Sequence, residues 1–212
     1  MLSTLALAIT LALGPVSVCS DLGPTARDDT LQELYLAGQT FDEFMGAAVR
    51  RKRLWDGNYA RSMEIDQTLV ERARAVGGTW RFLVVAVDSC SDSVNTIPYL
   101  ARLVEMVDGF DMRVVNSRVG RKVMEDHPTP DGRASTPTVL LLDDHWNERG
   151  CFIERPPALR DWILENPEDL NDSDIFERKM AWYDEDAGQQ TLEEVLAILE
   201  SAARAETRCG KQ

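Results

Sequence analysis

One segment of this sequence is apolar at almost every position, and it constrains the fold more than any other feature. It runs from Trp80 to Val87 and contains the uninterrupted stretch Phe82-Leu83-Val84-Val85-Ala86-Val87. A strand that is apolar on both sides belongs in the middle of a sheet that is covered on both faces. The segment therefore predicts the central strand of an α/β domain.

Helical and strand patterns alternate after this strand. A helix that opens near Cys90 and a strand from Phe110 to Val115 come first, followed by a short helix from Arg118 to Glu125. Thr138 to Leu142 and Arg149 to Glu154 are two further apolar strands, and they flank a turn that predicts a hairpin. This order predicts one compact mixed sheet with helices on both faces.

Helical patterns also flank the predicted sheet domain. Capping boxes at Thr30 and Thr40 and an N-cap at Asp66 predict three helices on the N-terminal side. Three more are predicted after the hairpin, near residues 157–165, 174–183 and 192–205. The predicted organisation is an N-terminal helical extension over residues 21–78 and a sheet domain with C-terminal helices over residues 79–212.

The first twenty residues differ in kind from the rest. Leu2 to Leu13 form an apolar run too short to span a bilayer, and small residues around Cys19 follow a Gly-Pro break. This pattern predicts a secretory signal peptide over residues 1–20, although the segment carries no Lys or Arg. A lipoprotein anchored at Cys19 is the alternative. We expect export to the oxidising bacterial periplasm, and no other segment that crosses a membrane.

The charge of the chain excludes one class of partner. The 212 residues carry a formal net charge of -13, whereas binding to nucleic acid requires clustered Lys and Arg. Only Arg50-Arg51-Lys52-Arg53 forms a basic run. Its place after an amphipathic segment favours a solvated face or a helix C-terminus. We therefore expect no nucleic-acid partner.

Cys90 lies just after the central strand, in the first turn of the next helix. Ligands in open α/β sheets bind outside the carboxyl ends of the strands, and the amides at a helix N-terminus stabilise a thiolate. A buried inert cysteine is the opposing interpretation. Two prolines favour the reactive role, because Pro98 interrupts the same helix and Thr136-Pro137 precedes an apolar strand, where a cis bond is tolerated.

Together these features resemble the thioredoxin-like superfamily, in which a Cys-x-x-Cys helix start, a helix-kinking proline and a Thr/Ile-Pro before a hairpin follow in this order. The segment Val87 to Pro98 is similar to the Glu-Asp-Trp-Cys-Gly-Asp segment of a group of bacterial thioredoxin family proteins. The resemblance extends to Leu54 to Tyr59, to Arg155-Pro156-Pro157 and to residues 182–191. It thus covers nearly all of the chain that follows the predicted signal peptide.

The resemblance implies a role for each residue of the site. Cys90 would be the exposed attacking cysteine, and Pro137 would be cis and pack against it. The Thr136 backbone would pair with an extended client segment. Ser93 stands where a dithiol enzyme has its second cysteine, so no intramolecular disulfide can form there.

The sequence also departs from the family pattern around the thiol. Ser89 replaces the tryptophan that usually precedes the nucleophile, and the central strand carries no buried acid. Asp88 and Asp92 lie close to Cys90 in sequence instead. Acids beside a thiolate oppose the effect of the helix N-terminus, and the sequence leaves the balance between the two open.

The other cysteines and the two histidines have weaker claims. Cys151 alternates with apolar residues in a strand, which favours a packed core cysteine. Cys209 has three open roles: a disulfide with Cys151, a resolving thiol for Cys90, or none. We interpret His127 as a surface histidine in a loop and His145 as part of a hairpin turn. No spaced set of Cys and His predicts a metal site, and we expect no cofactor.

Two functions follow from these residues. The first is one-cysteine thiol-disulfide exchange, in which Cys90 forms a mixed disulfide with a client protein. A second thiol, such as a low-molecular-weight thiol, then releases the client. Such chemistry suits isomerisation or de-glutathionylation. The second is a redox-inactive thioredoxin-fold module that binds an extended peptide beside Pro137.

Overall fold

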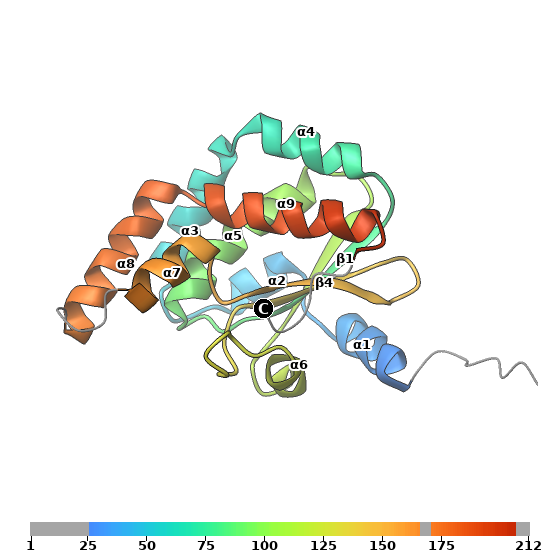
Figure 1. Cartoon of the computed structure of the whole chain (residues 1–212), viewed down its shortest axis with the longest axis horizontal. Coiled ribbons are helices and arrows are strands. Elements are labelled where there is room, and N and C mark those ends of the chain that lie inside the picture. The colour runs from blue at the N-terminus through green and yellow to red at the C-terminus, as the bar shows by residue number, and fades with distance from the viewer. Residues whose placement is uncertain (1–25, 166–170, 207–212) are drawn as a thin grey trace, which may run out of the picture.

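The structure is a computed structural model that describes residues 26–165 and 171–206. The predicted signal peptide, Cys19 and Cys209 lie outside the described residues. Four strands form one mixed sheet in the order β2-β1-β3-β4 (Figure 1). In chain order the elements are α1 (Ala26–Leu36), α2 (Phe41–Ala47), α3 (Lys52–Arg61), the 3-10 helix η1 (Ser62–Glu64), α4 (Gln67–Val76), β1 (Trp80–Val85), α5 (Ser91–Glu105), β2 (Phe110–Val115), α6 (Arg121–Asp126), β3 (Thr138–Leu142), β4 (Glu148–Ile153), α7 (Pro157–Glu165), α8 (Asp172–Asp186) and α9 (Gln189–Ala203).

β1 lies in the interior of the sheet, as its apolar sequence predicted. It is parallel to β2 and antiparallel to β3, and β3 forms the predicted hairpin with β4. Successive side chains of a strand point to opposite faces. Phe82 and Val84 therefore enter one hydrophobic core while Leu83 and Val85 enter the other, and all four are fully buried.

Helices cover both faces of the sheet (Figure 1). Helices α3, α4, α5 and α9 build the core on one face, with Trp55, Leu69, Leu100 and Leu196 among its members. Helices α1 and α6 cover the opposite face. The α/β fold with a mixed sheet between helical layers is confirmed, and the N-terminal helices share their core with the sheet. Among the described residues, no helix has both the length and the apolar character needed to cross a bilayer.

Local capping signals set the start of two N-terminal helices. The Thr40 hydroxyl accepts from the Glu43 amide at 3.2 Å, and the Glu43 carboxylate accepts from the Thr40 amide at 2.8 Å, so the predicted capping box is confirmed. Asp66 caps α4 as predicted. The helix start predicted at Thr30 is wrong, because α1 begins at Ala26 and Thr30 lies inside it.

Candidate functional site

Cys90 lies where the chain passes from β1 into α5. It is the N-cap residue of α5, and its Sγ accepts a hydrogen bond from the Ser93 amide at 3.4 Å. The side chain is half-buried and its thiol is free. The amide and the positive end of the helix dipole both favour negative charge on this sulfur.

The loop before β3 brings a second segment against the thiol. The Thr136-Pro137 peptide bond is cis, as the family resemblance implied. The Cys90 thiol donates to the Thr136 carbonyl over 3.1 Å. Because β1 and β3 are antiparallel neighbours, the start of β3 lies beside the end of β1. The structure therefore brings together Cys90, Ser93, Thr136 and Pro137, which the sequence had singled out.

Ser93 lies one helical turn beyond Cys90 and is fully buried. Its main-chain amide donates to the Cys90 sulfur, but its hydroxyl has no hydrogen-bond partner within the described residues. A buried hydroxyl without a partner costs free energy. Because serine has no sulfur, the Ser93 side chain can neither form a disulfide with Cys90 nor resolve a mixed disulfide.

Asp88, two residues before Cys90, ties this loop to the start of the α3 region. Its Oδ2 accepts from the Val49 amide at 2.9 Å and from the Arg50 amide at 2.7 Å. Desolvation by burial acts to raise the pKa of Asp88, but these hydrogen bonds outweigh it and hold the pKa below its ordinary value. The carboxylate that the sequence placed beside the thiol is thus occupied by amide donors.

The basic run at residues 50–53 supports the same loop. Arg51 is the N-cap of α3, so the basic run begins a helix. The prediction that the run ends a helix is wrong, because α2 already ends at Ala47. The Arg51 Nε donates to the Ser89 carbonyl at 2.7 Å. The Trp55 indole donates to the Asp88 carbonyl at 3.0 Å. These contacts fix the loop that carries the thiol.

Asp92 is a buried acid that sequence reasoning did not recognise as one. It is 5% exposed, and it accepts from the Tyr183 hydroxyl at 2.8 Å and from Lys179 Nζ at 3.0 Å. Arg155 adds a longer contact of 3.4 Å. Desolvation by burial, followed by the charge of Asp92, raises the pKa of Tyr183 well above its ordinary value, so the phenol stays a donor.

Only a weak signal for this network was present in the sequence. Arg155 and Tyr183 belong to segments that resemble the family, yet neither had an assigned role. Lys179 carried no signal at all, because it lies 87 positions from Asp92 along the chain. Only the packing of α8 against the start of α5 brings the two together.

Helix α8 also places an aromatic ring near the loop. The Phe176 ring is 41% exposed. The guanidinium of Arg51 lies 5.7 Å from its centroid, and the ammonium of Lys179 lies 5.6 Å from it. These two cations also hold Ser89 and Ser91, the residues on either side of Cys90. Phe176 therefore lies beside the two cations that hold the residues on either side of Cys90.

The core packing predicted for Cys151 is confirmed, whereas the prediction for His127 is wrong. Cys151 packs against the second core but is disulfide-bonded, with a partner outside the described residues. His127 is buried and not a surface histidine: its Nδ1 lies 2.7 Å from the Val123 carbonyl and its Nε2 lies 2.8 Å from the Glu148 carboxylate. The reason is that α6 ends immediately before His127 and directs the ring to β4.

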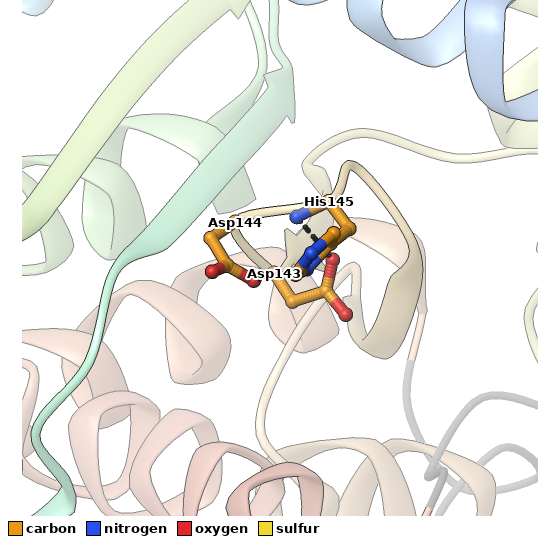
Figure 2. Close-up of side chains that lie close together, drawn as sticks. All are labelled: Asp143, Asp144 and His145. Atoms are coloured by element: carbon orange, nitrogen blue, oxygen red, sulfur yellow. Dashed lines mark hydrogen bonds and ion pairs between the residues drawn. The ribbon is translucent and has the colours of Figure 1, made fainter.

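A cluster of possible metal ligands lies in the β3–β4 turn, where Figure 2 shows Asp143, Asp144 and His145. The Asp143 carboxylate accepts from the His145 and Asn147 amides, both at 2.9 Å. It also accepts from Arg149 Nε at 2.7 Å. Such bonds are typical of a turn that an aspartate side chain stabilises. We assign the cluster to the hairpin, in agreement with the structural interpretation of His145.

Comparisons with known proteins agree with this fold. A protein of unknown function from Pseudomonas aeruginosa is 23% identical, with a TM-score of 0.62 over 81% of this chain and 97% of that chain. An HIV epitope scaffold is also 23% identical, with a TM-score of 0.60 over 80% of this chain and 97% of that chain. At this identity both structures support the fold alone. No curated protein matches the sequence.

The family assignment rests on a different comparison. A family model described as Thioredoxin matches residues 38–172. This range is more than half of the chain, and it contains the whole sheet together with Cys90 and the cis bond before Pro137. The chain therefore belongs to the thioredoxin family.

Proposed function

We propose that the protein performs thiol-disulfide exchange through a single cysteine, Cys90. One observation carries this proposal: the free, half-buried Cys90 thiol lies between the Ser93 amide and the Thr136 carbonyl. The amide and the helix N-terminus favour the thiolate, and the thiolate is the nucleophile in disulfide exchange.

The proposed reaction has two steps. The Cys90 thiolate attacks one sulfur of a client disulfide, which forms a mixed disulfide and releases the other client sulfur as a thiolate. A second thiolate then attacks the client sulfur of this mixed disulfide and returns Cys90 as a thiolate. This second thiol is a low-molecular-weight thiol or another thiol of the client. The bonds exchange without net oxidation of Cys90, which suits isomerisation or de-glutathionylation.

Thr136 would hold the client during this exchange. In the thiol form its carbonyl accepts from Cys90, but a thiolate has no hydrogen to donate. Ionisation therefore frees the Thr136 carbonyl for an amide of an extended client segment. The buried Ser93 hydroxyl, which lacks a partner among the described residues, would be available to donate toward the sulfur.

A redox-inactive module that binds peptides beside Pro137 is the second candidate. It is favoured by the lack of a second sulfur at Ser93 and of an aromatic side chain at Ser89. In this case the backbone beside Pro137 would bind an extended peptide and the thiol would be a remnant.

Trapping of the mixed disulfide separates the two functions. The purified protein is incubated with glutathione disulfide or a disulfide-bonded peptide, and modified cysteines are mapped by peptide mass spectrometry. Exchange predicts an adduct at Cys90 that a small thiol removes. The Cys90→Ser variant is the control without a nucleophile, and Ser93→Ala is the matched control that keeps it. Absence of an adduct, with equal peptide binding by wild type and Cys90→Ser, would replace exchange with the binding module.

We further propose that residues 1–20 direct export, with a lipoprotein anchored at Cys19 as the alternative. The disulfide at Cys151 supports this, because structural disulfides persist in oxidising compartments and are rare in the cytosol. Fractionation of the native host and mass measurement of the mature N-terminus test the proposal. A chain that keeps its first residues in the cytosol would contradict it.

A further inference from the structure

The Asp92 carboxylate creates an electrostatic problem for a reactive Cys90. It is buried two residues after the thiol, in the first turn of α5. A buried negative charge close to a thiol opposes the ionisation of that thiol. The site can use the helix N-terminus to stabilise a thiolate only if something balances this carboxylate.

Lys179 is the cation best placed to balance Asp92. Its Nζ donates to the Asp92 Oδ2 at 3.0 Å, and Asp92 is its only carboxylate partner among the described residues. Arg155 also contacts Asp92, but its Nη2 lies only 2.6 Å from the Glu154 carboxylate, which already offsets its charge. Glu154 is shared in turn with Arg133. Within residues 26–165 and 171–206, Lys179 therefore has no competing anion.

Lys179 makes a second contact that concerns Cys90 directly. The same ammonium donates to the Ser91 hydroxyl at 2.8 Å. Ser91 and Asp92 are the two residues that follow Cys90, so one side chain from α8 holds both. Lys179 and Asp92 are both buried, and this strengthens their interaction because little water screens the two charges.

We propose that Lys179 is a positioning residue for Cys90. Lys179 neutralises the charge of Asp92 and holds the first turn of α5, so that this turn favours the Cys90 thiolate. This inference deepens the proposed function and rests on Cys90 acting as a nucleophile. Except in the variant that replaces Tyr183, the other groups around Lys179 and Cys90 stay the same in the test. They are the Ser93 amide, the Thr136 carbonyl, Asp88 with its amide donors, Arg51 at the Ser89 carbonyl, Tyr183, Arg155 and Glu154.

The test follows the pH dependence of Cys90 alkylation by iodoacetamide, read by mass spectrometry of the Cys90 peptide in the oxidised protein. Lys179→Met removes the charge and keeps the length of the side chain. We expect the midpoint of the pH profile to move up by about one pH unit, the size of effect that a nearby charge produces. The rate at neutral pH should fall about tenfold, whereas the rate at high pH, where the thiol is fully ionised, should not change.

A double variant shows whether the effect passes through Asp92. Asp92→Asn alone should move the midpoint down, because the negative charge is gone. Lys179→Met combined with Asp92→Asn should return it close to the wild-type midpoint. Lys122→Met is the matched control, since this lysine is an exposed residue of α6 paired with Asp126. An unchanged midpoint in Lys179→Met, or the same shift in the double variant, would overturn the inference.

Two further variants guard against a loss of folding. Lys179→Arg keeps the charge and should restore the wild-type midpoint. Tyr183→Phe removes only the hydroxyl donor to Asp92 and should cause a smaller upward shift; if Lys179→Met does not fold, this variant decides. Alkylation requires no client, so midpoints that shift as expected without any mixed disulfide would retain the positioning role and refute exchange.

Discussion

The side-chain amide of Asn58 donates to the main-chain carbonyl of Val94 at 2.8 Å, and this carbonyl is the one that Pro98 leaves without a helical donor. In an α-helix the amide of residue i donates to the carbonyl of residue i-4, and proline has no amide hydrogen. Asn58 lies on α3 and is buried. A helix from the N-terminal part of the chain therefore supplies a donor to the carbonyl that Pro98 leaves unpaired within α5.

Replacement of Asn58 should expose the free-energy cost of the amide that Pro98 lacks. Asn58→Leu keeps the shape of the side chain but leaves the buried Val94 carbonyl without a donor, which costs about 1–3 kcal/mol of unfolding free energy. Pro98→Ala in the same chain restores an amide to that position and should recover part of the loss. Urea denaturation of the two single variants and the double variant measures the coupling. Purely additive losses would contradict the assigned role of Asn58.

Gly188 is expected to reject any side chain. It has a φ of 82°, and a Cβ there would lie 2.2 Å from Cγ of the buried Tyr99 ring. Gly188→Ala should therefore lower the unfolding free energy by about 2 kcal/mol or more, through overpacking and backbone strain. Gly46→Ala is the control, because its Cβ would meet no atom within 4 Å and alanine favours a helix. Equal stability of the two variants would refute this packing argument.

Ser93→Cys should convert the monothiol site into a dithiol site. The Ser93 position is one helical turn from Cys90, and its amide already contacts the Cys90 sulfur. The new thiolate would attack the Cys90 sulfur of a mixed disulfide, release the client as a thiol and leave an intramolecular disulfide. We expect insulin reduction with dithiothreitol as electron donor, which wild type and Ser93→Ala should lack. Failure to form that disulfide would show that the two positions are not aligned.

Asp88 should contribute stability that depends on pH. Its pKa is depressed in the folded protein, so its contribution is complete above the ordinary value of 3.8 and disappears as the pH falls through the lower folded value. Asp88→Asn keeps an acceptor oxygen but loses the charge, and should cost about 1 kcal/mol at pH 7. Urea denaturation at pH 7, 5 and 3 should show wild type and variant converging below about pH 4. A gap that stays constant with pH would argue against ionised Asp88 as the anchor.

The disulfide at Cys151 should link it to Cys209. Cys90 is free, and Cys19 belongs to the predicted signal peptide. Peptide mapping without reduction should recover Cys151 and Cys209 in one cross-linked species. Closing a loop of this length stabilises the folded state by about 4 kcal/mol in the chain-entropy treatment, so reduction should lower the melting temperature. Recovery of Cys151 linked to Cys19 would contradict both this pairing and removal of the signal peptide.

Local and strongly periodic features were predictable from the sequence. The apolar run around Leu83 identified the central strand, and the hairpin of β3 and β4 followed from strand patterns on either side of a turn. The proximity of Cys90 to Thr136 came from the order of elements and the family resemblance. His127 was mispredicted, because its burial depends on where Glu148 of β4 lies.

The sequence by itself determined the order of helices and strands along an α/β domain, the presence of Ser93 where a second cysteine would follow Cys90, and the helix start at Thr40. These follow from side-chain periodicity, residue identity and hydrogen bonds within a few positions of the chain. Only the tertiary structure decided which groups donate to the two carboxylates beside Cys90 and balance their charge. Asp88 is held by amides 38 and 39 residues away, and Asp92 by Lys179, 87 residues away. Charge balance depends on distance in space, which no local pattern in the sequence encodes.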